Sequence, residues 1–215
     1  MSIFSWSLSE KRRMEELKHS DVCTHISNKE DQDILTRRLF DVNMRLFHSS
    51  PEYRKIVLGV CEYIVLQTKT KREGYKKPHG FSGANAGIPF NIIGYWKNWT
   101  TNPEEGGSVN IMINPKILKF YGKKIISKSN CGSIILKEPV DVVRDEFIDV
   151  EFYNTSGKKV LLEGVSREQC GLTIQHEIEH NNGILILDKM LDSEKANQLK
   201  KEYFGEKNDS SSNAS

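Results

Sequence analysis

The sequence predicts an α+β fold in which a helix in the last quarter of the chain carries the motif His-Glu-x-x-His. Three observations lead to this prediction. Apolar residues recur at helical spacing across residues 51–68, whereas apolar and polar residues alternate across 147–153, as in a half-buried strand. The motif itself occupies 176–180 and is surrounded by isoleucines and leucines. Helices and strands are therefore both expected, with the motif helix buried among them.

The helices are predicted from their start and stop signals. Ser50-Pro51 is a helix start with proline in the first turn. Ser166 is a capping candidate ahead of the motif helix, which is expected to end near Gly183. Asp192 opens a final helix that reaches about residue 204. Residues 1–45 are expected to form a polar, partly helical extension, residues 46–206 the main domain, and residues 207–215 a disordered tail.

Four segments are typical of strands, and one is typical of a loop. The strand-like segments are residues 91–96, 108–114, 147–153 and 160–164. Asn114-Pro115 is expected to end the second strand in a turn, and residues 154–158 have the composition of a hairpin turn. Residues 80–89 are rich in glycine but lack the Lys-Ser/Thr of a phosphate-binding loop. This segment is expected to approach a ligand or a strand closely through its backbone.

The composition excludes several classes of protein. A net charge of only +2 on 215 residues does not indicate DNA binding, which needs a basic surface, although contact with ribosomal RNA is left open. Four cysteines without a Cys-x-x-Cys pair are too few for a disulfide scaffold of this length. The first residues lack the apolar stretch of a signal peptide, and no apolar run is long enough to cross a membrane. A cytoplasmic location is expected, with an organelle as the alternative.

The motif at 176–180 has the spacing of a metal site. His176 and His180 are four residues apart, so a helix places both imidazoles on the same face. Glu177 projects about 100° around the helix from His176, within reach of a water on the same metal. A third ligand must come from elsewhere, with a fourth position left for water. A chance match would lie on a solvated helix face, whereas the apolar neighbours indicate a buried helix whose polar groups need partners.

These residues resemble the peptide deformylase family, whose three motifs occur here in order. Residues 175–185 read Gln-His-Glu-Ile-Glu-His-Asn-Asn-Gly-Ile-Leu, similar to the family pattern QHExDHLNGxL. Residues 129–133 keep the Cys and Ser of EGCLS, and residues 80–89 resemble GLAAPQ with Asn85 in place of the Gln. The resemblance extends over about residues 50–205. It implies mixed or antiparallel β-sheets wrapped around a central metal helix, with an N-terminal helical extension and a C-terminal helix.

The resemblance also implies the third metal ligand. This is Cys131, which would bind as a thiolate beside His176 and His180. A Cys-His-His site with one open position can hold one divalent metal. The family implies Fe²⁺ as the metal in the cell, with Zn²⁺ or Ni²⁺ as alternatives.

The catalytic roles are likewise carried over from the family. Glu177 would take a proton from the metal-bound water and pass it to the leaving amine. The oxyanion would be held by the metal, the backbone N–H of Gly132 and the side-chain amide of Asn85. Because Asn85 is one methylene shorter than the family's Gln, restoring Gln is predicted to raise turnover. The family's Glu is lost at Ser129, which frees Arg144 for another partner.

The implied activity is removal of the formyl group from the N-terminal methionine of a nascent polypeptide. Six residues are expected to bind this substrate: Gly80, Phe81, Gly83, Ser133, Arg144 and Leu172. A monomer is expected, with the ribosome as a further partner and no membrane or DNA partner. Two alternatives stay open, namely a hydrolase for another N-acyl or peptide substrate and a weakly active, metal-retaining peptide-binding protein. Retention of Glu177 favours an enzyme, because a binding protein has no use for a general base.

Overall fold

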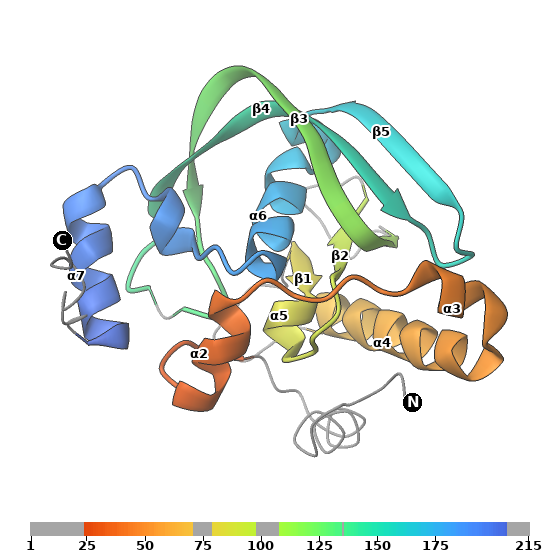
Figure 1. The fold of residues 1–215 in the computed structure, drawn as a ribbon. Coiled ribbons are helices and arrows are strands. Elements are labelled where there is room, and N and C mark those ends of the chain that lie inside the picture. The colour runs from red at the N-terminus through yellow and green to blue at the C-terminus, as the bar shows by residue number, and fades with distance from the viewer. Residues whose placement is uncertain (1–23, 71–78, 98–107, 135, 206–215) are drawn as a thin grey trace, which may run out of the picture.

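A single five-stranded antiparallel sheet organises the protein. The computed structural model describes residues 24–70, 79–97, 108–134 and 136–205 (Figure 1). The strands pair in the order β1-β2-β3-β4-β5, and every neighbouring pair is antiparallel. Their bounds are β1 Gly80–Ser82, β2 Ile92–Trp96, β3 Val109–Ser129, β4 Val140–Tyr153 and β5 Lys159–Val165. The predicted α+β class is confirmed.

Strands β3 and β4 are longer than the sequence predicts. The turn expected at Asn114-Pro115 is wrong, because β3 continues through it after a shift of register between Ile113 and Lys116. Asn114 adopts a positive φ of 53°, which asparagine tolerates better than most residues. Its side-chain Oδ1 accepts from the Val42 N–H and its Nδ2 donates to the Val42 carbonyl. A tertiary contact therefore stabilises a β-bulge where local sequence indicates a strand end.

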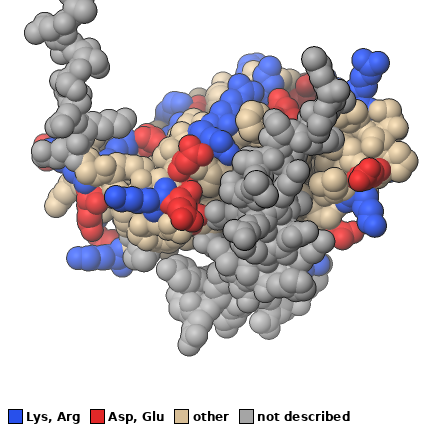
Figure 2. Space-filling view, turned by 60° about the horizontal axis from the view of Figure 1, so that its bottom comes forward, with Lys and Arg blue, Asp and Glu red and all other residues tan. Residues whose placement is uncertain are grey.

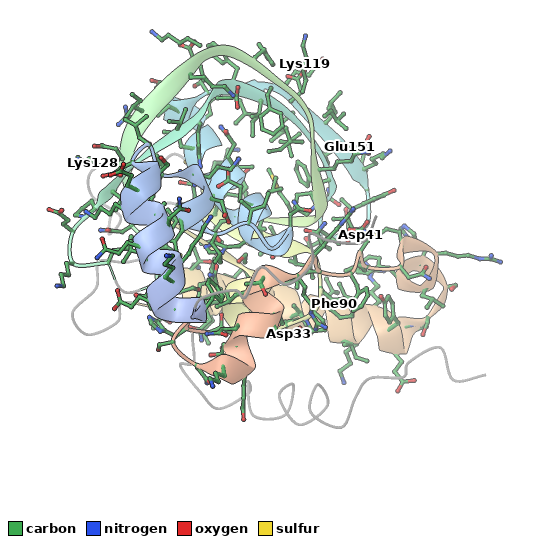
Figure 3. The ribbon with its side chains drawn as sticks, turned by 60° about the vertical axis from the view of Figure 1, so that its left-hand side comes forward. Asp33, Asp41, Phe90, Lys119, Lys128 and Glu151 are labelled. Atoms are coloured by element: carbon green, nitrogen blue, oxygen red, sulfur yellow. The ribbon has the colours of Figure 1, made fainter. Side chains whose placement is uncertain are left out.

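The bulged β3–β4 hairpin forms an arch over the rest of the molecule (Figure 1). Figure 3 shows Lys119, Lys128 and Glu151 on the outer side of this arch. Oppositely charged residues pair across the strands: Lys128 with Asp141 at 2.9 Å and Lys159 with Glu151 at 2.9 Å. The face drawn in Figure 2 likewise shows Lys and Arg beside Asp and Glu among the described residues. Within the hairpin Lys124 also pairs with Asp145, whereas Lys159 lies on β5 and pairs with Glu151 of β4.

Six α-helices and two short 3-10 turns complete the described part of the chain. Their bounds are α2 Lys29–Thr36, α3 Met44–Ser49, α4 Pro51–Lys69, α5 Gly83–Ala86, η1 Arg167–Gln169, α6 Gly171–Asn181, η2 Ile186–Lys189 and α7 Ser193–Phe204. Two of the predicted helix starts are capped: the Ser50 side chain accepts from the Tyr53 N–H, and Asp192 accepts from the Lys195 N–H. Ser166 instead precedes the 3-10 turn η1, and α6 begins after Cys170 without a side-chain cap, so the cap predicted ahead of the motif helix is wrong. The glycine-rich segment at 80–89 forms a short strand and one helical turn instead of an open loop.

Helix α6, which carries the motif, lies at the centre beneath the arch (Figure 1). Its buried Ile174 and Ile178 belong to an apolar cluster with Ile93, Met112 and Ile148 of the sheet. The Gln175 side chain adds polar ties to β4, since it accepts from the Asp145 N–H and donates to the Asp145 carbonyl. At the C-terminal end of α6, the Asn181 side chain accepts a hydrogen bond from the Ala84 N–H of α5 and donates one to the Ile92 carbonyl of β2. These contacts fix the helix against both the sheet and the 80–89 segment.

Residues 24–42 pack into the core. Ile26, Leu35 and Leu39 are buried in one apolar cluster with Cys131 and Ile134. The division of the chain at residue 46 stays a prediction. Residues 1–23 of the predicted extension and the predicted tail at 207–215 lie outside the described residues. No helix in the described ranges is long and apolar enough to cross a membrane.

Candidate metal centre

Three potential metal ligands converge at the inner face of the arch. Cys131 Sγ lies 3.1 Å from His180 Nε2, and the ring centroids of His176 and His180 are 4.5 Å apart. One ligand atom from each of these residues lies within 4.8 Å of the others. The two histidines come from successive turns of α6, and Cys131 follows the end of β3 in a short bridge with Ile134. The three predicted ligands are therefore brought together.

Burial keeps both imidazoles in the form that a metal needs. Burial, together with the nearby Arg144 charge, lowers the pKa of His180 to about 4. It also lowers the pKa of His176 well below the usual value, with smaller contributions from His180 and Arg144. Both rings are thus neutral at pH 7, and a neutral ring offers a nitrogen lone pair to a metal.

Glu177 lies in the same buried region. Burial raises the pKa of its carboxyl, and the net pKa is about 8 because a hydrogen bond with Ser82 and the Arg144 charge offset only part of that rise. Gly80 makes room for this side chain, because a Cβ at position 80 would lie 2.7 Å from Glu177 Cγ. The close backbone approach predicted for the glycine-rich segment is therefore present, and it is an approach to the general-base candidate.

The arrangement fits one divalent metal. Within the described residues, three buried side-chain atoms of this site lack a hydrogen-bond partner: Arg144 Nε, Glu177 Oε2 and His180 Nδ1. Unpaired buried polar atoms are often explained by an ion or water, but the Arg144 Nε–H is a donor on a cation and gives no support for a metal. One thiol and two neutral imidazoles are suitable donors for zinc or ferrous iron. Glu177 Oε2 remains available for a proton.

Asn85 makes different contacts from those predicted for an oxyanion donor. Its Oδ1 accepts from the Ser82 N–H at 3.0 Å and from the Ser82 hydroxyl at 2.6 Å. Its Nδ2 donates to the Ser133 hydroxyl at 2.7 Å. The backbone of residues 24–26 lies across the same two segments, since Thr24 N–H donates to the Asn85 carbonyl and Ile26 N–H donates to the Ser133 carbonyl. Asn85 thus joins the 82–85 turn to the loop that holds Cys131.

This geometry reverses the expected effect of Asn85→Gln. The longer side chain must fit a buried site and displace the bond to Ser133, so we expect a loss of about 1–3 kcal/mol in stability. Turnover should fall as well, because the Cys131 loop loses an anchor. Thermal unfolding and steady-state kinetics would measure both effects, with Asn197→Gln on the exposed side of α7 as the matched control. Higher turnover in Asn85→Gln would instead support the oxyanion role.

The residues predicted to bind substrate differ in how far they are exposed to solvent. Phe81 and Ser133 are buried, Leu172 is half-buried in the first turn of α6, and Gly132 is exposed beside Cys131. At Gly83 a Cβ would collide with the Phe90 carbonyl, so backbone packing accounts for this glycine. Their contacts with a substrate remain predictions.

Arg144 does not fit the predicted substrate-binding role. Its side chain is only 1% exposed and points at α6, where it contacts Glu179 and His176. Sequence analysis did not assign Ser82 or Glu179 to the site. Glu179 has a local signal, since it lies one turn after His176, but nothing in the sequence around Ser82 indicates its contact with Glu177.

Comparisons with known proteins show the family of the chain. The sequence model of the family described as Polypeptide deformylase matches residues 63–196. A peptide deformylase of Chloroflexus aurantiacus is 32% identical over 92 residues, which cover 43% of this chain and 48% of the relative. One from Buchnera aphidicola subsp. Acyrthosiphon pisum is 30% identical over 125 residues, which cover 58% and 64%. The chain thus spans between about half and two thirds of the length of these curated relatives.

Solved structures show the same fold. The peptide deformylase of Synechococcus elongatus in complex with actinonin has a TM-score of 0.59 at 20% identity, covering 84% of both chains. That of Thermotoga maritima has a TM-score of 0.57 at 21% identity, covering 78% of this chain and 95% of the other. At these identities the likeness concerns the fold alone.

Proposed function

Because the chain belongs to the peptide deformylase family, we propose that it hydrolyses the N-formyl group from the N-terminal methionine of newly made polypeptides. The observation that carries this proposal is the convergence of Cys131, His176 and His180 next to the buried carboxyl of Glu177. A binding protein would need the ligands at most, whereas a hydrolase also needs a group that moves a proton.

The proposed hydrolysis needs both a metal and side chains of the protein. A divalent metal held by Cys131, His176 and His180 would supply Lewis-acid activation of water near neutral pH. Glu177 would accept the proton of the attacking water through its unpaired Oε2 and return it to the leaving amine. The exposed Gly132 would donate its backbone N–H to the developing oxyanion. Asn85 would act indirectly, by holding the Gly132 loop through Ser133.

We expect Fe²⁺ as the metal in the cell and Zn²⁺ or Ni²⁺ as alternatives, since one sulfur and two nitrogen donors accept all three. The proposed partner is the formylated N-terminus of a nascent chain. Association with the ribosome, a monomeric state and a cytoplasmic location remain predictions from the sequence.

The function is tested by an anaerobic assay of the iron(II)-loaded protein. A formyl-methionyl peptide should be hydrolysed at a rate proportional to iron content, while the matching acetyl-methionyl peptide should be cleaved far more slowly. Preference for the acetyl peptide would indicate a hydrolase for another N-acyl substrate. Tight peptide binding without turnover of either peptide would indicate the metal-retaining binding protein and contradict the proposed activity.

A further inference from the structure

Strand β5 forms an open edge of the sheet. The strand order places β5 at one end, where it pairs with β4 alone among the described residues. Strand β1, at the opposite end, has every residue from Gly80 to Ser82 buried. Figure 1 shows β5 beside β4 on the outer side of the arch. The outward N–H and C=O groups of such a strand are a template for pairing with another strand.

The regular part of this edge covers residues 159–163. Gly164 adopts a positive φ of 67°, and its N–H donates to the Asp149 side chain instead of continuing the ladder. The register between β4 and β5 shifts at the same place, between Ile148 and Val150. A second strand can therefore add along residues 159–163 without meeting the bulge.

The exposed face of β5 is complementary to itself. Lys159, Leu161 and Glu163 are exposed and alternate along the strand, so they share one face. In an antiparallel pair of two β5 strands centred on Leu161, Lys159 of each copy lies opposite Glu163 of the other. Leu161, which is 51% exposed, lies opposite itself on the axis. Each charge on this face then meets an opposite charge, and the leucine is covered.

The other face of β5 agrees with the same register. Val160 and Leu162 are half-buried and pack against the apolar cluster beneath the sheet. The axis at Leu161 places Val160 of each copy opposite Leu162 of the other, so this face stays apolar across the junction. Moving the axis by one residue in either direction places Leu161 opposite a charged side chain. One register therefore suits both faces.

Lys159 also has a partner in its own chain. Its Nζ lies 2.9 Å from Glu151 Oε2, and the two side chains are 55% and 32% exposed. Exposed pairs of this kind contribute little to stability, and an ammonium group has three donors. Lys159 can therefore pair across the axis with Glu163 of a second copy while it keeps its contact with Glu151.

We propose that two copies of the chain associate through β5, as an antiparallel strand pair about a two-fold axis at Leu161. The sheets of the two copies join into one, and because β1 at the far edge is buried, association ends at the dimer. A single strand pair buries little surface, so the dimer is transient and depends on concentration. The proposal replaces the monomer predicted from the sequence and does not depend on the metal site.

Sedimentation velocity of the purified full chain at increasing concentration tests the proposal. The wild type should show a monomer–dimer equilibrium. Glu163→Lys and Lys159→Glu each place like charges opposite one another at both ends of the strand pair, so each should raise the dimer Kd by about 10–100-fold. A mixture of these two variants has opposite charges at both positions and should form a heterodimer with a Kd close to that of the wild type.

A further variant tests the axis itself. Leu161→Glu places two carboxylates together on the axis and should remove the dimer. Its control is Leu118→Glu on β3, because Leu118 is similarly exposed, at 48%, and lies outside β5. The control for Glu163→Lys is Glu62→Lys on the exposed side of α4. Both control variants should dimerise as the wild type does, and circular dichroism would show that every variant is folded.

Several outcomes would overturn the proposal. A wild type that stays monomeric at every concentration would do so, as would folded Glu163→Lys and Lys159→Glu proteins that fail to associate with each other. A loss of the dimer in Leu118→Glu as large as that in Leu161→Glu would place the interface elsewhere. Oligomers larger than a dimer would contradict the closed two-fold arrangement.

Discussion

Replacement of Glu177 by glutamine will lower turnover of a formyl-methionyl peptide by about 10²–10⁴-fold, the usual contribution of a general base. Glutamine keeps the shape of the side chain and cannot accept the proton. Metal content should not change, because Glu177 is not among the three converging ligands. Initial rates and elemental analysis of the same sample would measure both quantities. Near-wild-type turnover at full metal content would exclude this role.

The same variant provides a second measurement in the metal-free protein. The ordinary pKa of a glutamate is 4.5, and burial raises that of Glu177 to about 8. The folded state therefore holds this proton more tightly, so its contribution to stability is largest below pH 4.5 and is lost as the pH rises through 8. Glu177→Gln should thus stabilise the metal-free chain at pH 9, by on the order of 5 kcal/mol, and have little effect at pH 4.5. Denaturant unfolding at the two pH values would show the difference.

Replacement of Cys131 by alanine should nearly abolish metal binding. The thiol is buried 3.1 Å from His180 Nε2, so its loss removes one of three donor atoms and leaves the two histidines alone. We expect Zn²⁺ affinity to fall by more than about 100-fold, beyond the range of changes that affect only outer contacts. Elemental analysis and the Zn²⁺-dependent rise in melting temperature would measure the loss.

Cys61→Ala is the control for that variant. Cys61 is also a buried cysteine, but it lies on α4 and packs in a different apolar cluster, and burial raises the pKa of its thiol to about 12. It therefore stays protonated at neutral pH, and it is not part of the Cys-His-His group found among the described residues. Equal metal content in Cys131→Ala and the wild type would remove Cys131 from the site.

Some of the candidate site follows from local sequence. The His-Glu-x-x-His spacing alone places His176 and His180 on one helix face with Glu177 beside them, because helix geometry fixes residues four apart. The helix at 51–69 and the caps at Ser50 and Asp192 also depend only on nearby residues. A hydroxyl or carboxylate just before a helix accepts hydrogen bonds from the free N–H groups of its first turn. These features could be predicted because they depend on neighbours within a few residues.

Other features depend on residues distant in the chain. Cys131 is 49 residues from His180. The resemblance to a family predicts it as a ligand, but only the packing of the segment after β3 against α6 brings its sulfur close to His180. Asn85 was assigned to the oxyanion by analogy, but the nearby Ser133 hydroxyl and the crossing of residues 24–26 turn its amide toward structural partners. No periodicity predicts which distant polar group a buried amide will contact.

The sequence by itself determined the helix that carries the motif, its two histidines and the adjacent glutamate, because the motif spans little more than one turn of helix. Only the tertiary structure decided that β3 continues past Asn114, since the bonds to Val42 stabilise a bulge that local preference opposes. It also decided that Arg144 faces Glu179 and His176 instead of a substrate. The physical reason is that a buried charge pairs with the group that the packing of helices and strands brings next to it, and this packing depends on the whole sheet.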